Sequence, residues 1–315
     1  FRASLSGAYT CFRCFFILLM GLRIGMENDQ PVPMPTCAAA TVVLLRDAVD
    51  GMEVFMVKRH GLSDVLGGAH VFPGGKVDPG DTDPNVLEQF GAPLDDLRAE
   101  LGEPELDTAT AAGLFVAACR ETFEEAGVLL AEGATAQHIE ITQMRAREGL
   151  HFGDILARLE LRPDWSNIVP WSRWITPRVP RMINKRFDAR FFLAAVPNGQ
   201  EARHDNHEAT GSFWLRPRVV LEQYWDGKLN LAPAQIMSMA ALARHPHVAD
   251  AVADARGRRP PVIQPELFRH EELRAIAFPG NERHPIVELA LPGPSFLVYR
   301  NERFEPFDGF ETLFA

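Results

Sequence analysis

"CRETFEEAGV" (residues 119–128) places three glutamates beside an arginine in an otherwise apolar part of the chain. Apolar side chains recur at helical spacing through residues 111–127, which predicts a helix with one buried stripe. Gly127 suits the C-terminal end of this helix, because glycine readily adopts the left-handed conformation of a helix cap. Each residue advances by about 100° around a helix, so the three glutamates share the face opposite the stripe. They are Glu121, Glu124 and Glu125.

Like charges this close destabilise a helix by about a few tenths of a kcal/mol per pair. A solvated acidic face tolerates that cost, whereas a divalent cation would reverse it, since Mg²⁺ and Mn²⁺ bind clustered carboxylate oxygens. The glutamates alone leave both interpretations open. A glycine-rich loop, "HVFPGGKVDPGD" (residues 70–81), precedes the helix. Gly74 and Gly75 would let the backbone approach a metal or a phosphate closely, which favours the cation site.

The remainder of the chain mixes strands and helices without a regular alternation, which indicates an α+β fold. Apolar, β-branched runs at 37–47 and 53–59 flank a turn and predict a hairpin. Residues 82–110 are acidic and carry several prolines, so we expect an insertion on the surface. The sequence predicts three parts. These are a disordered leader over 1–35, a main domain over 36–256, and an extension packed on it over 257–315.

Composition excludes several classes of protein. The 315-residue chain carries a formal net charge of −10, which argues against general nucleic-acid binding, because phosphate backbones attract basic surfaces. Four cysteines do not make a disulfide framework and are typical of reduced thiols in a cytoplasmic protein. The apolar run at 15–20 is too short to span a bilayer, so we expect no membrane association.

Two separated motifs identify a family. Gly75-x5-Asp81, followed by Arg120-Glu121-Thr122-x-Glu124-Glu125-x-Gly127-Val128, resembles the signature box of Nudix hydrolases. Asp81 replaces the usual glutamate, and Thr122 holds a position for a bulky apolar residue. Residues 82–119 separate the two halves, where the family has seven residues. This split box is similar to that of the branch related to peroxisomal coenzyme A diphosphatases, and the resemblance covers roughly residues 37–245.

The resemblance implies a fold and a chemistry. The fold would be an α/β/α sandwich around a mixed sheet, with an insertion in the box and a C-terminal extension. The reaction would cleave a diphosphate with water and Mg²⁺ or Mn²⁺. The implied metal ligands are Glu121, Glu124, Glu125 and the Gly75 carbonyl, and the implied catalytic residues are Arg120, Glu124 and Glu125. Glu208 lies where related enzymes carry a loop carboxylate that acts as base, although a simple turn residue explains it equally well.

The substrate is indicated by a second motif. "GAHVFPGG" (68–75) and Arg59 fit a coenzyme A motif of related enzymes, but Asp64 stands where that motif has a second arginine. The candidate substrate-binding residues are Lys58, Arg59, His70 and Gly74. The first hypothesis is hydrolysis of coenzyme A or acyl-CoA to 3′,5′-ADP and (acyl-)4′-phosphopantetheine. ADP-ribose, NADH or another nucleoside diphosphate derivative is the alternative substrate.

A non-catalytic nucleotide-sensing module is the alternative of another class. Such a module is expected to lose carboxylates of the box, and this chain retains Glu121, Glu124 and Glu125. The expected partner is therefore a small nucleotide-diphosphate substrate. Formation of a homodimer is left open by the sequence.

Overall fold

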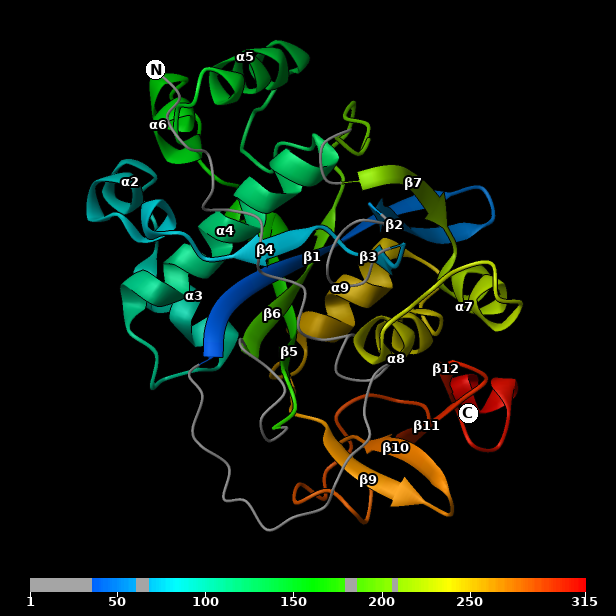
Figure 1. The fold of residues 1–315 in the computed structure, drawn as a ribbon. Helices are drawn as coiled ribbons and strands as arrows, with labels where there is room; N and C mark the ends of the chain where they lie inside the picture. Colours follow the sequence, from blue (N-terminus) through cyan, green and yellow to red (C-terminus); the bar gives the residue numbers. More distant parts are fainter. Residues whose placement is uncertain (1–35, 61–67, 179–185, 206–208) are drawn as a thin grey trace, which may run out of the picture.

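The structure is a computed structural model that describes residues 36–60, 68–178, 186–205 and 209–315. Its centre is an eight-stranded sheet (Figure 1) with the order β3-β2-β1-β6-β5-β8, in which β4 also pairs with β1 and β7 with β2. The strands are β1 (Thr36–Ala48), β2 (Gly51–Arg59), β3 (His70–Val71), β4 (Gly74–Lys76), β5 (Val169–Ile175), β6 (Arg186–Ala195), β7 (Ala209–Leu215) and β8 (Val262–Ile263).

The predicted hairpin is confirmed, since β1 and β2 pair antiparallel around a tight turn, with Leu45 opposite Val54. Parallel pairing of β1 with β6, and of β5 with β8, makes the sheet mixed. Alternate residues of β1 serve opposite faces, as the pleat requires. Val43 packs into one hydrophobic cluster and Val42 into the other.

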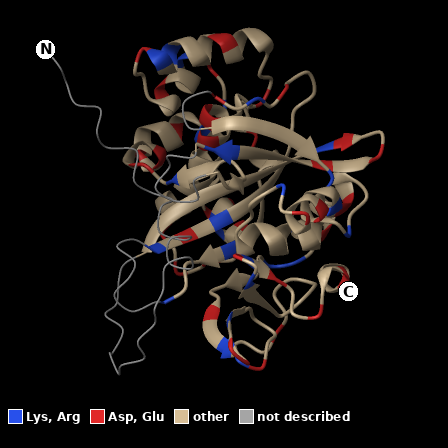
Figure 2. Cartoon of the chain, turned by 45° about the vertical axis from the view of Figure 1, so that its right-hand side comes forward, with Lys and Arg blue, Asp and Glu red and all other residues tan. Residues whose placement is uncertain are grey.

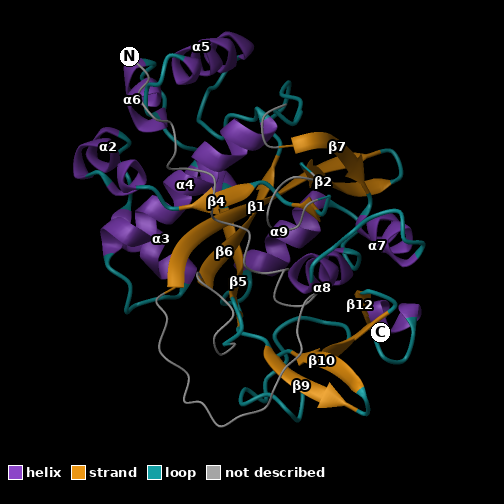
Figure 3. Ribbon diagram, viewed as in Figure 1, coloured by secondary structure: helices purple, strands orange, loops and turns teal. Residues whose placement is uncertain are grey.

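Helices cover both faces of the sheet (Figure 3), which confirms the predicted α+β sandwich. On the Val42 face lie α2 (Pro84–Gln89), α3 (Leu94–Leu101), α4 (Thr108–Ala126), α5 (Ala136–Arg147) and α6 (Phe152–Arg158). On the Val43 face lie α7 (Pro217–Trp225), α8 (Pro233–Leu242) and α9 (Val248–Arg256). We call these the α4 face and the α8 face.

The insertion at 82–110 is folded, and the expectation of a purely surface segment is wrong for its inner side. Leu87 of α2 and Leu97 of α3 are buried in the cluster on the α4 face. Glu103 is also buried, and both of its carboxylate oxygens bind Arg190 of β6, at 2.9 and 2.5 Å. A second arginine, Arg173 of β5, lies 2.8 Å from Glu103. The insertion therefore contributes a buried charge that two sheet strands neutralise.

The C-terminal residues form a second, antiparallel sheet. Its order is β12-β11-β10-β9, with bounds β9 (Glu266–His270), β10 (Leu273–Ala277), β11 (Phe296–Arg300) and β12 (Arg303–Glu305). Ile276, Leu297 and Phe304 join the same apolar cluster as α8. Short 3-10 helices occur at Pro79–Thr82, Trp165–Asn167 and Phe310–Phe314.

Charges are distributed through the fold. Figure 2 shows basic and acidic residues interspersed along helices, strands and loops. None of the helices in the described ranges combines the length and the apolar character that a membrane crossing needs.

Thr122 of α4 provides a test of packing. Its side chain is fully buried, and its hydroxyl has no hydrogen-bond partner among the described residues. Because an unpaired buried hydroxyl costs free energy, Thr122→Val should raise the free energy of unfolding by about 1 kcal/mol. Thr142→Val is the matched control, since the equally buried Thr142 hydroxyl donates to the His138 carbonyl at 2.7 Å. Denaturant unfolding should show the control variant destabilised. Equal losses in both variants would contradict the assignment.

Candidate active site

The predicted helix of the box is confirmed as α4, which begins three residues before the predicted start. The Asp107 side chain caps it by accepting a hydrogen bond from the Thr110 N–H at 2.8 Å. Gly127 ends it with a φ of 67°, and its N–H donates to the Phe123 carbonyl. Both caps are the residue types that such positions favour. The glutamates therefore lie on the last turns of a helix with fixed ends.

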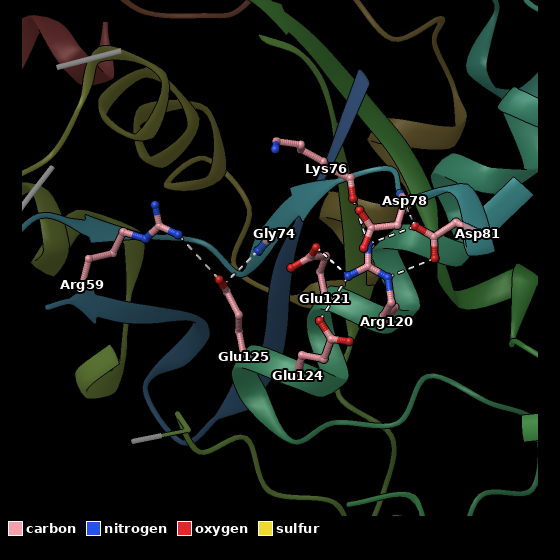
Figure 4. A network of polar contacts seen from close by, with 9 residues as sticks. All are labelled: Arg59, Gly74, Lys76, Asp78, Asp81, Arg120, Glu121, Glu124 and Glu125. Atoms are coloured by element: carbon pink, nitrogen blue, oxygen red, sulfur yellow. Dashed lines mark hydrogen bonds and ion pairs between the residues drawn. The ribbon is translucent and has the colours of Figure 1, made fainter. Parts of the chain in front are cut away.

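The interpretation of these glutamates as a solvated face is wrong for two of them. The side chains of Glu121 and Glu125 are only 13% and 10% exposed, whereas that of Glu124 is 49% exposed. The loop around β4 covers this part of the helix (Figure 4). Burial of two ionisable groups at the end of one helix is costly, which is typical of a functional site.

The loop needs glycine at positions 74 and 75 because its backbone lies too close to neighbouring atoms for a side chain. A Cβ on Gly75 would lie 2.2 Å from Glu121 Oε1, and one on Gly74 would lie 2.5 Å from the Ala40 carbonyl oxygen. Without those side chains, the Gly74 N–H donates to Glu125 Oε2 at 3.0 Å. The backbone thus lies directly against two of the carboxylates, whereas the sequence predicted its close approach to a metal or a phosphate.

Arg120 organises the site with all five of its N–H groups. Its Nε and Nη2 bind the two Asp81 oxygens at 3.0 and 2.9 Å, and Nη2 also donates to the Lys76 carbonyl at 2.8 Å. Its Nη1 donates to Glu121 Oε1 at 2.8 Å and to Glu124 Oε2 at 3.1 Å. Burial lowers the pKa of Arg120, but these carboxylates outweigh burial and hold the pKa above its usual value. Arg120 is therefore a fixed cation that joins the two halves of the box.

Negative charge remains in excess here. The groups involved are the carboxylates of Asp81, Glu121, Glu124 and Glu125 and the guanidiniums of Arg59 and Arg120. Burial raises the pKa of Glu121 to about 7, although Arg120 opposes the rise. Burial also raises the pKa of Glu124. An additional cation would relieve this shortage of positive charge.

The donor chemistry fits a divalent cation. Glu121 and Glu124 each give one oxygen to Arg120, which leaves Glu121 Oε2 and Glu124 Oε1 outside those bonds. Hard carboxylate oxygens of this kind are the ligands that Mg²⁺ and Mn²⁺ prefer. Among the described residues, no three His, Cys, Asp or Glu side chains are already arranged around a metal position. Glu125 is instead turned toward Gly74, so binding would require the carboxylates to reorient.

The predicted substrate-binding residues separate into two groups. Arg59 and Gly74 lie beside Glu125, with Arg59 Nη2 3.8 Å from Glu125 Oε1. Lys58 and His70 are cross-strand neighbours on the opposite, α8 face of the sheet. The structure therefore does not bring this second pair to the carboxylates. Glu208 lies outside the described residues.

His70 is held as a neutral ring. Its backbone N–H donates to the Asn230 carbonyl at 2.9 Å, and its Nδ1 accepts from the Asn230 N–H at 3.3 Å. Burial, followed by the charge of Lys58, lowers the pKa of His70 to about 4. Since Nδ1 is the acceptor, the proton of the neutral ring is on Nε2.

This environment predicts a pH dependence of stability. The folded pKa of His70 is below its unfolded value of about 6.5, so the unfolded chain binds the proton more readily. The stabilisation is complete above the unfolded pKa and is lost as the pH falls toward the folded pKa. The free energy of unfolding should fall between pH 7 and pH 4 in both proteins. The fall should be about 3 kcal/mol smaller in His70→Asn than in the parent chain. The exposed His247→Asn is the control, and an equal acid loss in all three proteins would contradict the prediction.

Sequence reasoning missed two contributors to this region. The Lys76 carbonyl binds Arg120, and the adjacent glycines were the available signal for a backbone role. Asp188 and Arg190 pair with Arg173 and Glu103. The sequence offered a signal for Asp188 and Arg190, because charged residues at alternate positions of an otherwise apolar strand indicate a paired, inward-facing set.

The chain is similar in sequence to known proteins. The family model described as the NUDT19 Nudix domain matches residues 37–242. Acyl-coenzyme A diphosphatase NUDT19 of Homo sapiens is 27% identical over 237 residues, which cover 64% of this chain and 63% of the relative. The protein of that name from Xenopus laevis is 25% identical over 225 residues, covering 60% of this chain and 59% of the relative. The chain thus spans about three fifths of the length of these curated relatives.

A solved structure supports the same relationship. The crystal structure of a NUDIX hydrolase from Alicyclobacillus acidocaldarius matches with a TM-score of 0.55 and 26% identity, covering 70% of this chain and 97% of that one. The family model itself spans well over half of the chain and includes both halves of the divided box. The chain therefore belongs to the Nudix hydrolases, in the family described by the NUDT19 Nudix domain.

Proposed function

We propose that this protein hydrolyses coenzyme A or acyl-CoA at the diphosphate, giving 3′,5′-ADP and (acyl-)4′-phosphopantetheine. Water adds its oxygen to one phosphorus, the bridging P–O bond breaks, and the water proton is released or passes to the leaving phosphate. Relatives that carry the name acyl-coenzyme A diphosphatase support this substrate. Nudix hydrolases generally use divalent metal ions, and Mg²⁺ or Mn²⁺ is the proposed cofactor.

The residues have distinct proposed roles. Glu121, Glu124 and Glu125, with the Gly75 carbonyl, would hold the cation. When bound, it would supply charge neutralisation and an activated water. Arg120 orients Glu121 and Glu124 through charge-assisted hydrogen bonds.

The substrate would lie against the glycine loop. Arg59 and Gly74, beside Glu125, would contact the diphosphate. Lys58 and His70 would contact other parts of the substrate. Glu208 is kept as a candidate base.

The observation that carries the proposal is the Arg120 centre. The Arg120 guanidinium, 39 residues beyond Asp81, uses all its donors to connect that aspartate, the glycine loop and the carboxylates of Glu121 and Glu124. A sensing module without turnover has no need of buried, charge-rich carboxylates at the end of a helix. Their retention favours catalysis over nucleotide sensing.

The deciding experiment compares substrates on the full chain. Coenzyme A, acetyl-CoA, NADH and ADP-ribose are incubated with Mg²⁺ and Mn²⁺ separately, and products are identified by mass spectrometry. We expect 3′,5′-ADP from coenzyme A or acetyl-CoA and no product in the presence of EDTA. If ADP-ribose or NADH is hydrolysed while neither coenzyme A nor acetyl-CoA yields 3′,5′-ADP, the proposed substrate is wrong and the hydrolysed compound takes its place. No turnover of any of them would favour the sensing module.

A further inference from the structure

The segment that follows β6 is fixed to the end of α4. The Arg203 N–H donates to the carbonyl of Ala126, the last residue of α4, at 2.9 Å. The side-chain amide of Gln200 accepts from the Leu129 N–H at 2.8 Å and donates to the Leu129 carbonyl at 2.9 Å. These three hydrogen bonds hold the segment against the end of the helix that carries Glu125.

His204, the next residue, connects this segment to β7. Its Nδ1 lies 2.8 Å from Ser212 Oγ, and its backbone N–H donates to the same oxygen at 3.4 Å. Because Oγ accepts from the backbone, its hydroxyl proton is directed to Nδ1, and the neutral ring carries its proton on Nε2. Ser212 pairs with Val57 of β2, which packs into the cluster on the α4 face. The His204–Ser212 hydrogen bond therefore joins the end of α4 to two strands of the sheet.

The pairing of β7 with β2 is interrupted close to this bond. The register shifts between Lys58 and Arg59, where Thr210 of β7 is left over, as in a β-bulge. A bulge disrupts the ladder locally and changes the direction of a neighbouring side chain. The side chain beside this bulge is that of Arg59, which points toward Glu125 (Figure 4), with Nη2 3.8 Å from Oε1. The ion pair thus lies where the ladder itself is weakest.

We propose that the His204–Ser212 hydrogen bond positions Arg59 over Glu125, which makes His204 and Ser212 positioning residues for binding of the diphosphate. The inference rests on the proposed function, in which Arg59 contacts the diphosphate. The contacts close a ring that runs from α4 through residues 200–204 to β7 and β2, and back to α4 through the ion pair. Opening this ring at Ser212 lets its two sides move apart at the bulge, which moves the Arg59 guanidinium away from the diphosphate.

Kinetics of serine variants test this role. Ser212→Ala should raise KM for coenzyme A about tenfold and leave kcat within about threefold, because a contact made equally to substrate and transition state affects binding alone. Ser212→Thr keeps the hydroxyl and should restore KM. Ser295→Ala is the matched control, since the half-buried Ser295 hydroxyl accepts from Asn281 Nδ2 at 2.9 Å in the C-terminal extension. The control should leave KM and kcat at the parent values.

Binding without turnover separates this proposal from the proposed reaction. The probe is α,β-methylene-ADP, whose P–C–P bridge resists hydrolysis, and AMP is the comparison ligand without the second phosphate. In calorimetry with Mg²⁺, Ser212→Ala should weaken binding of the probe about tenfold and binding of AMP by less than about twofold. In an Arg59→Gln background, the same change should cost no further affinity for the probe, because its effect passes through Arg59.

The outcomes of this cycle are distinct. Additive losses from Ser212→Ala and Arg59→Gln, an equal loss for AMP, or no loss at all would overturn the positioning role. If coenzyme A is not hydrolysed but the two losses on the probe remain non-additive, the proposed reaction is wrong and the positioning role is retained.

Discussion

Glu124→Gln should lower kcat for the diphosphate substrate by about two to four orders of magnitude while the chain stays folded. The variant keeps the size of the side chain and an oxygen that can still accept from Arg120 Nη1, now 3.1 Å away. It removes the negative charge that a divalent cation requires. Because the Glu124 side chain is 49% exposed, the free energy of unfolding should change little. Steady-state kinetics at saturating metal measure kcat, and denaturant unfolding measures the free energy of unfolding.

Glu140→Gln is the control for this variant. Glu140 is an exposed glutamate of α5, and its replacement changes the net charge equally. It should leave kcat within about twofold of the parent, since exposed charges away from the site have small effects. Unchanged turnover in Glu124→Gln would remove Glu124 from the reaction. Loss of both turnover and folding would assign it a structural role instead.

The features that sequence predicted well are local. The helical spacing of apolar residues over 111–127, together with Gly127, predicts α4. The motifs at Gly75 and Arg120 identify the fold around it. The opposite faces of Lys58 and Arg59 were also predictable, because adjacent residues of a strand point to opposite sides. Assigning both to one substrate site overlooked that rule.

The remaining features depend on distant partners. Glu103 can be buried because it pairs with Arg190, which lies 87 residues away in the sequence. The composition of the insertion does not contain that partner and therefore predicted a surface segment. The parallel pairing of β1 with β6 likewise joins segments that no local pattern connects. The neutral state of His70 depends on Asn230, 160 residues further along the chain. Each feature needs the folded topology before its chemistry can be recognised.

Arg120→Ala should lower the free energy of unfolding by about 3–5 kcal/mol near pH 8. Removing this side chain leaves Asp81, which is 3% exposed, without its bidentate partner, and leaves Glu121 without its cation. Burial already raises the pKa of Glu121, and loss of the Arg120 charge would raise it further above the unfolded value, so the unpaired carboxylates cost more free energy when they are ionised. Their destabilising effect therefore grows as the pH rises and shrinks as they become protonated. Chemical unfolding at pH 5 and pH 8 should show a smaller deficit at pH 5.

A double-mutant cycle identifies the pair responsible. Asp81→Asn should reduce the cost of Arg120→Ala, because the buried charge that lost its partner is no longer present. Arg120→Lys should recover only part of the stability, since an ammonium has three donors in place of the five that Arg120 uses. Additive effects of Asp81→Asn and Arg120→Ala would show that the two halves of the divided box are energetically independent. A coupling of more than about 1 kcal/mol would show that the helix and the glycine loop are stabilised through this one guanidinium.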